Sequence, residues 1–342
     1  MLLRSTSLAV LLLATACKAA PPASTPPAIA TTSAPEALIQ GPPPPTTHSA
    51  NKPTGADVLK LTQQYVAAAP KRPVNSPGHA AAEAFIKAHF APEAAKGNFI
   101  DDTFQATNTP IGPVVMHNFI VKFPGKKDGL IVLASHYETN YPLKDINFVG
   151  ANDGACTTAL LIALGQYYRD HPPQGYSVWL LFDDGEEAID NPPYAADQWS
   201  DSNSLYGTRH IAAKWSADGT LGHIKAFIVA DMLGWKQMNI DKEQNSTPWL
   251  LDLLAKAGKD TGHSAYLFKN SLAIDDDHIP FKDRGVPVLD VIAYTYGQPD
   301  STRPGDYTFH HTAEDSMDKL SATTLGVTSD LFLDLVKLID QR

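Results

Sequence analysis

Four short apolar runs recur after position 54, and apolar residues occupy consecutive positions in each of them. A strand that is apolar on both faces is typical of a parallel sheet covered by helices on both sides. Segments with the apolar spacing of amphipathic helices lie between the runs. The runs are Leu130–Ser135, Tyr176–Phe182, Ala226–Ala230 and Val286–Ile292, and the helical segments are Gly154–Tyr168, Ser204–Trp215, Pro248–Gly258 and Thr323–Leu338.

Upstream of these runs the pattern predicts two helices, Ala56–Ala69 and Gly78–Phe90, followed by two strands, Asn98–Ala106 and Val114–Phe123. Alternation of strands and helices favours an α/β fold, here a three-layer α/β/α sandwich around a mixed, mostly parallel central sheet. No linker-like composition recurs after Pro53. We therefore expect one catalytic domain over residues 54–342.

The first 53 residues have a different character. Residues 1–16 combine a basic start, a short apolar run and small residues before Cys17, which predicts a signal peptide. The preceding Ala14-Thr15-Ala16 with Cys17 resembles a bacterial lipobox, although Ala14 stands where Leu is usual; plain secretion with cleavage after Ala16 is the alternative. Residues 17–53 are rich in Pro, Ala and Thr and predict a disordered stalk. We expect an exported protein, periplasmic or lipid-anchored to a bacterial membrane.

The formal net charge is −10. An acidic balance argues against a nucleic-acid partner, which normally requires a basic face. The chain has only two cysteines, Cys17 and Cys156, so a disulfide framework is excluded. We expect a monomer that contacts the membrane only through the lipid at Cys17.

Acidic residues and histidines follow the apolar runs at the points where the runs end. In open α/β sheets, sites form outside the carboxyl ends of the strands. Carboxylate and imidazole ligands together suit Zn²⁺. The segments concerned are His136-Tyr137-Glu138, Asp183-Asp184-Gly185-Glu186-Glu187, Asp231, Asp153 just before a helix, and His310-His311 in a late loop.

Each of these residues also has an ordinary interpretation. Asp153 is placed to cap a helix, and Glu186 with Glu187 reads as a solvated acidic turn. A single histidine is more often structural or exposed than a ligand. The coincidence of such residues at several strand ends is what favours a metal site.

Six passages resemble the animal-type glutaminyl cyclases, which are zinc-dependent glutaminyl-peptide cyclotransferases within the superfamily of M28 zinc aminopeptidases. They occur in the family's order and span the domain after the stalk. The passages are Ser135-His136-Tyr137-Glu138, Phe148-Val149-Gly150-Ala151-Asn152-Asp153, Phe182-Asp183-Asp184-Gly185-Glu186-Glu187-Ala188, Ser204-Leu205-Tyr206-Gly207-Thr208-Arg209-His210, Asp276-Asp277-His278-Ile279-Pro280-Phe281 with Arg284-Gly285-Val286-Pro287-Val288-Leu289, and His311-Thr312.

The resemblance implies one catalytic zinc ion held by Asp153, Glu187 and His311. It also implies that Glu186 is the general base and acid. The substrate would be a peptide or protein with N-terminal glutamine, which is converted to pyroglutamate with release of ammonia. This is the reaction of an acyltransferase of the aminoacyltransferase class.

Four further residues take roles from the resemblance. Asp231 and Asp276 would form an acid pair beside the site, with Asp277 as the alternative to Asp276. Trp199 would be a pocket tryptophan, and Ile274 would line an apolar wall.

The sequence departs from the family pattern at several points. His310 stands where a pocket Trp is expected, and Glu138 stands where the family has Asp. Extra residues lengthen the loop around 189–198 and the loop between Ile292 and His311. Cys156 lies in the region of the family's disulfide but has no partner cysteine. We expect His310 to contact the substrate at this position, with Phe309 or Tyr307 as alternative sources of the aromatic packing.

Two other functions remain open. In a dizinc M28-type aminopeptidase, His136 and Asp231 would hold a second zinc ion and Asp153 would bridge the two. Such an enzyme needs no extra acid at Asp276, which separates it from a cyclase. A non-catalytic peptide-binding protein on the same fold predicts missing ligands, and none is missing.

Overall fold

The computed structural model describes residues 52–190, 200 and 202–342. The predicted signal peptide and nearly all of the stalk lie outside the described residues, as do Trp199 and most of the 189–198 segment. All described residues belong to a single compact unit. None of the helices among them combines the length and the apolar character that crossing a membrane requires.

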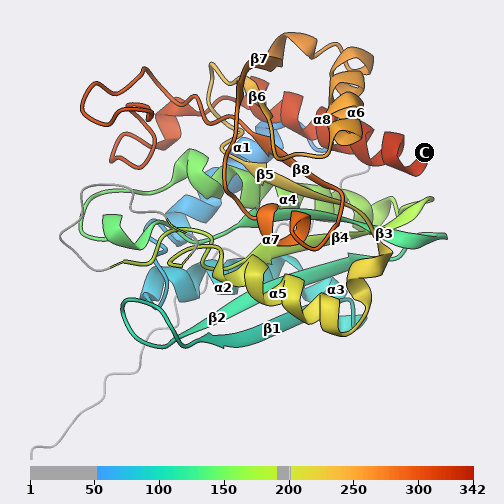
Figure 1. Ribbon diagram of the computed structural model, residues 1–342, viewed down its shortest axis with the longest axis horizontal. Coiled ribbons are helices and arrows are strands. Elements are labelled where there is room, and N and C mark those ends of the chain that lie inside the picture. The colour runs from blue at the N-terminus through green and yellow to red at the C-terminus, as the bar shows by residue number, and fades with distance from the viewer. Residues whose placement is uncertain (1–51, 191–199, 201) are drawn as a thin grey trace, which may run out of the picture. The chain divides into compact units, whose positions relative to one another are not determined.

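A six-stranded sheet forms the centre of this unit, with strand order β1-β2-β4-β3-β5-β8 (Figure 1). The pairs β3–β4, β3–β5 and β5–β8 are parallel, whereas β1–β2 and β2–β4 are antiparallel. The predicted mixed, mostly parallel sheet is therefore confirmed. The strands are β1 (Phe99–Ala106), β2 (Val114–Phe123), β3 (Lys127–His136), β4 (Tyr176–Asp183), β5 (Ile224–Asp231) and β8 (Val288–Ile292).

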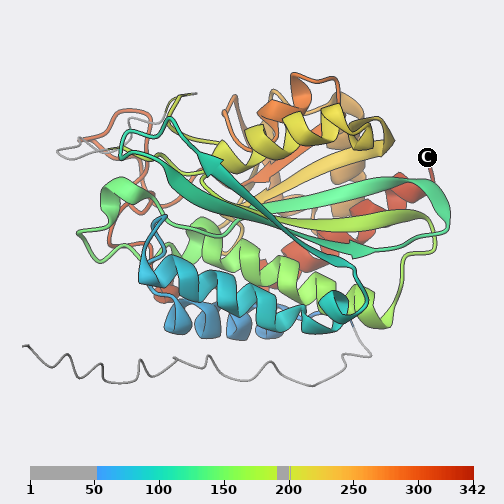
Figure 2. The same ribbon diagram turned by 90° about the horizontal axis from the view of Figure 1, so that it is seen from below.

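Helices cover both faces of the sheet (Figure 2). Side chains alternate between the two faces of a strand, so Ile131 and Leu133 of β3 enter one apolar core while Val132 and Ala134 enter the other. This is why the central strands are apolar at every position. The larger core is closed by α1 (Gly55–Ala68), α2 (Pro77–His89), α4 (Cys156–Asp170), α6 (Pro248–Asp260) and α8 (Ala322–Asp340), and the smaller by α5 (Tyr206–Ala217) and α7 (Ile279–Lys282).

Local signals explain where the helices begin. Thr54 caps α1 by accepting a hydrogen bond from the Asp57 amide, and the Asp57 side chain accepts from the Thr54 amide in return. Ser76 caps α2 in the same manner, and Pro77 occupies the first helical turn. The predicted helices therefore start within about two residues of the observed ones, the scatter expected at helix ends.

A second, two-stranded parallel sheet of β6 (Ile240–Glu243) and β7 (Leu267–Leu272) lies outside the predicted elements. So do several short helical segments. These are α3 (Ala91–Ala95) and the 3₁₀ turns η1 (Tyr141–Leu143), η3 (Thr220–His223), η4 (Ser264–Tyr266) and η5 (Met317–Lys319). The π-helical turn η2 (Ala151–Ala155) begins before the predicted helix Gly154–Tyr168 and overlaps its first two residues.

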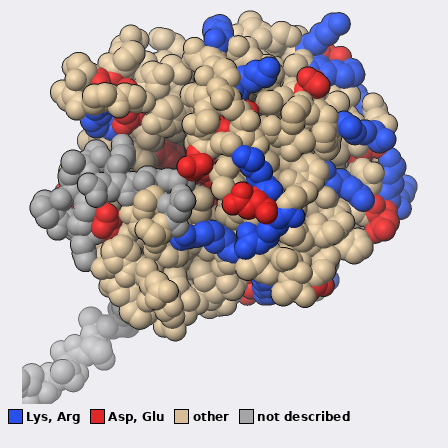
Figure 3. Space-filling view, viewed as in Figure 1, with Lys and Arg blue, Asp and Glu red and all other residues tan. Residues whose placement is uncertain are grey.

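Charged side chains on the face shown in Figure 3 are of mixed sign. Lysine and arginine are interspersed with aspartate and glutamate rather than gathered in one field. The acidic residues that matter for chemistry lie instead at one edge of the central sheet.

Candidate active site

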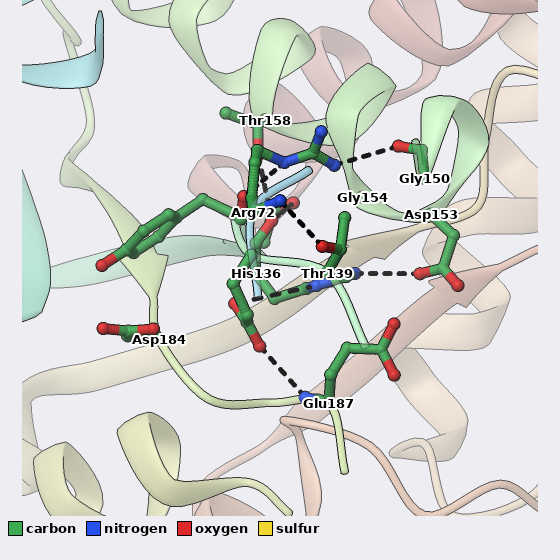
Figure 4. A network of polar contacts seen from close by, with 12 residues as sticks. Arg72, His136, Thr139, Gly150, Asp153, Gly154, Thr158, Asp184 and Glu187 are labelled. Carbon is green, nitrogen blue, oxygen red and sulfur yellow. Dashed lines mark hydrogen bonds and ion pairs between the residues drawn. The ribbon is translucent and has the colours of Figure 1, made fainter. Parts of the chain in front are cut away.

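The carboxyl ends of β3, β4 and β5 carry the acidic and histidine residues that the sequence singled out. His136 ends β3 and pairs in register with Asp183 at the end of β4, while Asp231 ends β5 beside Ile292 of β8. Parallel strands bring their carboxyl ends to one edge of the sheet. Residues distant in the sequence therefore meet there (Figure 4).

The three proposed metal ligands converge at this edge. The Nε2 atom of His311 lies 3.2 Å from Oδ2 of Asp153 and 3.2 Å from Oε2 of Glu187. Asp153 comes from the turn η2 before α4, Glu187 from the loop after β4, and His311 from the loop before α8. All three side chains are buried.

This donor set fits a zinc ion. Ligand atoms about 2.0–2.1 Å from a tetrahedral zinc ion lie about 3.3 Å from one another, close to the separations found here. Oδ2 of Asp153 and Oε1 of Glu187 are buried and accept no hydrogen bond. Burial opposes ionisation of Asp153, but the neighbouring imidazoles of His136 and His311 hold its pKa well below the usual value. Two buried carboxylates with free oxygens beside an imidazole are the arrangement that a divalent cation satisfies.

A second group of possible ligands shares Asp153. Nε2 of His136 lies 3.2 Å from Oδ1 of Asp153 and 3.4 Å from Oδ1 of Asp231. Figure 4 shows His136 directed at the Asp153 carboxylate. The separations again suit a cation, so Asp153 has the position of a bridging ligand between two adjacent sites.

Glu186 belongs to the same cluster and precedes Glu187 in the chain. Its side chain lines the cavity described below, and it groups with His136 and Glu138 closely enough for the three to share an ion. Burial raises the pKa of Glu186 well above the usual value, against the opposing effect of His136. A carboxyl group with a raised pKa is suited to accept and return a proton near neutral pH.

Asp231 and Asp276 line the same cavity. Burial raises the pKa of both, and for Asp276 the charges of Asp231 and Asp277 add to the effect. Asp277 faces elsewhere, because its carboxylate accepts a hydrogen bond of 2.6 Å from the Thr208 hydroxyl. The structure thus presents Asp276, rather than Asp277, to the cavity.

The cavity has a volume of about 640 Å³ and opens over these residues. Ile274 lies on its apolar side with Leu272, Ala273 and Ile292. This places the predicted pocket residue Ile274 at the cavity. Trp199, the other predicted wall residue, lies outside the described residues.

His310 also lines the cavity, at the position where the resemblance leads one to expect a tryptophan. Its Nδ1 lies 2.7 Å from Oδ1 of Asp306, and its ring stacks on His311 with centroids 3.9 Å apart. Tyr294 meets the His310 ring edge-on at 5.0 Å, and Tyr307 also lines the cavity. The wall is therefore aromatic but carries polar atoms.

Several further residues support the site, and of these only Glu138 was singled out in the sequence. Glu138 Oε1 accepts a hydrogen bond of 3.0 Å from the Glu187 amide, and Asn140 Nδ2 donates to Glu187 Oε2 at 2.8 Å. Arg72 is fully buried and donates to the backbone carbonyls that surround the site, those of Ala69, Tyr137, Val149 and Gly150. Figure 4 shows its contact with Gly150. Glu138 and Arg72 act on backbone groups, and contacts of this kind leave no motif in the sequence.

The sheet order, the flanking helices and the buried carboxylate and histidine ligands define a zinc-exopeptidase-like α/β protein. The sequence profile of peptidase family M28 matches residues 118–336, and the chain belongs to this family.

Within the family, the chain is similar to several proteins named glutaminyl cyclase or glutaminyl-peptide cyclotransferase. The crystal structure of Acidobacteriales bacterium glutaminyl cyclase has 61% sequence identity and a TM-score of 0.81, covering 86% of this chain and 99% of that one. The glutaminyl-peptide cyclotransferase of Drosophila melanogaster is 30% identical over 53% of this chain, and the glutaminyl-peptide cyclotransferase-like protein of Bos taurus is 30% identical over 65%. The matches span 56% and 62% of the length of these two curated relatives.

Proposed function

We propose that this chain is a zinc-dependent glutaminyl-peptide cyclotransferase that converts N-terminal glutamine of peptides or proteins to pyroglutamate and ammonia. The observation that carries the proposal is that Glu186, Asp231 and Asp276 line one cavity together with the three metal ligands. An aminopeptidase of this fold requires no acid at the position of Asp276. The 61% identity to a glutaminyl cyclase supports the same conclusion.

Asp153, Glu187 and His311 would hold one zinc ion where they line the cavity. When bound, zinc supplies a Lewis acid that polarises the side-chain amide of the substrate glutamine. The three ligands come from rigid segments at the sheet edge, so they are held in place before the substrate enters.

The reaction joins two groups of one residue. The substrate's α-amine nitrogen forms a bond to its own side-chain amide carbon, the carbon–nitrogen bond to the amide NH₂ breaks, and ammonia leaves. Glu186 accepts a proton from the α-amine and returns it to the departing nitrogen, so the side chain ends as it began. No water is consumed. Because the nucleophile is tethered to the electrophile, the protein has only to fold the glutamine into a ring-like conformation.

Asp231 and Asp276 would act as an acid pair that shares one proton. Close, buried carboxyl groups rarely ionise together, and the pKa values of both are raised. The ionised member holds the substrate amine, while the protonated member donates a hydrogen bond toward the leaving nitrogen. Ile274 and His310, which both line the cavity, would contact the substrate, and Trp199 is proposed as a third contact.

The N-terminal sequence supports an exported protein. A signal peptide over 1–16 and a lipid on Cys17 would place the catalytic domain in the periplasm or on a bacterial membrane, at the end of the 17–53 stalk. Substrates would then be exported peptides or proteins.

A dizinc aminopeptidase is the second candidate, and one observation favours it. His136, Asp153 and Asp231 have the separations of a second zinc site. In that enzyme, water would attack the first peptide bond, with Glu186 as its base.

One experiment separates the two functions. The purified chain is incubated with a synthetic peptide that begins with glutamine, and the product is followed by mass spectrometry with and without a chelator. Loss of one ammonia from an otherwise intact peptide, abolished by the chelator, is the expected result. Release of free glutamine and a shortened peptide would overturn the cyclase proposal in favour of the aminopeptidase.

A further inference from the structure

Asp315 has no part in the chemistry described above, yet it is fully buried at the site. It lies four positions after His311 on the same loop, and its amide donates to the Thr312 carbonyl in a tight turn. Its carboxylate points away from this loop and reaches the segment that carries Asp153. Burying a carboxylate without a cationic partner is unfavourable unless hydrogen bonds compensate for the lost hydration.

The Asp315 carboxylate accepts three hydrogen bonds. Oδ1 accepts from the Asn152 amide at 2.8 Å and from the Tyr296 hydroxyl at 2.8 Å. Oδ2 accepts from the Asp153 amide at 3.2 Å. Asp315 therefore binds the backbone amides of two consecutive residues, Asn152 and Asp153.

The backbone at Asp153 needs such a partner. Asp153 and Gly154 have non-helical dihedral angles within the turn η2, immediately before α4. Amides at the start of a helix have no acceptor within the helix itself. Asp315 supplies acceptors to two of them from a distant loop, which fixes the position of the Asp153 side chain.

Asn152 extends this connection to a third segment. Its side-chain oxygen accepts from the Gly234 amide at 2.8 Å, and its side-chain nitrogen donates to the Met232 carbonyl at 3.2 Å. Met232 follows Asp231 directly. The segments that carry His311, Asp153 and Asp231 are thus joined through Asp315 and Asn152.

We infer that Asp315 is a positioning residue for the metal site, which holds Asp153 at the distance from His311 that a zinc ion requires. The inference rests on the proposed zinc site but not on the proposed reaction. Groups that orient metal ligands from behind typically change metal affinity about 10- to 100-fold when removed. Asp315 acts on the ligand's backbone rather than on its side chain, and it ties the segment of Asp153 to the loop that carries His311.

The test compares full-length wild type with Asp315→Asn. The substituted amide keeps one oxygen for the backbone but turns an NH₂ group toward the second donor. The dissociation constant for zinc is measured by competition with a chromogenic chelator, and the visible spectrum of the Co²⁺-loaded chain reports ligand geometry. We expect zinc to bind about 10- to 100-fold more weakly and the Co²⁺ spectrum to change.

Two further variants complete the design. Asp318→Asn is the matched control, because it removes the same charge from a largely exposed side chain on the same loop. It should leave both readouts unchanged. Tyr296→Phe removes one of the three bonds at Asp315 and keeps the ring, and we expect a smaller, severalfold loss of zinc affinity. This variant carries the test if Asp315→Asn does not fold.

The unfolding temperatures of the metal-free proteins distinguish a positioning role of Asp315 from a general contribution to stability. We expect the unfolding temperature of the metal-free Asp315→Asn chain to fall little, because Asp315 serves to arrange the metal ligands. Unchanged zinc affinity and an unchanged Co²⁺ spectrum would overturn the inference, as would a large loss of metal-free stability with intact zinc binding. A wild type that binds zinc tightly but does not cyclise glutamine would reject the proposed function and leave the inference about Asp315 standing.

Discussion

Nε2 of His79 lies 2.8 Å from Oδ1 of Asp184, and both side chains are buried. His79 belongs to α2, and Asp184 begins the loop that carries Glu186 and Glu187. The other oxygen of Asp184 accepts a hydrogen bond of 2.9 Å from the His117 amide on β2. The start of the catalytic loop is thus tied to a helix on one side and to a strand on the other.

This pair predicts a pH-dependent stability. Burial alone lowers the pKa of His79, but Asp184 outweighs it and raises the pKa from 6.5 to about 9. The protonated pair therefore stabilises the fold fully below pH 6.5, and this contribution is lost as the pH rises through 9. The shift corresponds to about 3 kcal/mol. In urea unfolding at pH 6 and pH 9.5, His79→Gln should lack this part of the pH dependence, whereas exposed His223→Gln should retain it.

Glu186→Gln should stop turnover without removing the metal. Glutamine has the shape of glutamate but cannot accept a proton, so the rate should fall about 10²- to 10⁴-fold. Glu187, the neighbouring ligand, is unchanged, and zinc content measured by atomic emission should equal that of wild type. Exposed Glu314→Gln serves as the control. A Glu186→Gln chain with a near-native rate would reject the role assigned to this residue.

Asp276→Asn and Asp277→Asn should differ sharply although the two residues are neighbours. Asp276 faces the cavity, and its loss should lower kcat for cyclisation about 100-fold. Asp277 binds the Thr208 hydroxyl, so its substitution should lower the unfolding temperature more than the rate. Steady-state kinetics and thermal unfolding of both variants provide the measurement. Equal effects on the rate would contradict the assignment of Asp276 to the acid pair.

Metal content should separate the two adjacent groups of ligands. The proposed enzyme holds one zinc ion per chain, at His311. His311→Ala should therefore lose the bound zinc and all activity, while His136→Ala should still hold one equivalent. Elemental analysis after dialysis at equal protein concentrations gives the count. Two equivalents in wild type and one in each variant would instead indicate a dizinc centre.

The architecture could be predicted from the sequence because its central strands are apolar on both faces. Val114–Phe123 matches β2 residue for residue, and Leu130–Ser135 lies wholly within β3. Because the strands are parallel, His136 and Asp231 at their carboxyl ends lie at the same edge of the sheet. The ends of these apolar runs therefore predict where the candidate site lies.

The small second sheet could not be predicted in this way. β6 reads Ile-Asp-Lys-Glu, which has no apolar periodicity. Its acidic residues are buried because backbone amides reach them, with Tyr294 donating to Asp241 and Asn245 to Glu243. Tertiary partners of this kind override strand propensity.

The supporting residues of the site were missed for a related reason. Arg72 and Asp315 bind backbone atoms of segments far away in the sequence. Any segment offers such atoms, so neither residue belongs to a recognisable spacing. Their roles depend on where the loops lie, and this becomes visible only in three dimensions.

The three metal ligands come from three connections that meet only when β3, β4 and α8 have all docked. An unfolded chain therefore has no zinc site, and binding free energy adds directly to the free energy of folding. At a zinc concentration 100 times the dissociation constant, this coupling amounts to about 2.7 kcal/mol. If the proposed export and zinc site hold, the supply of the ion outside the cytoplasm would set the enzyme's lifetime as well as its activity.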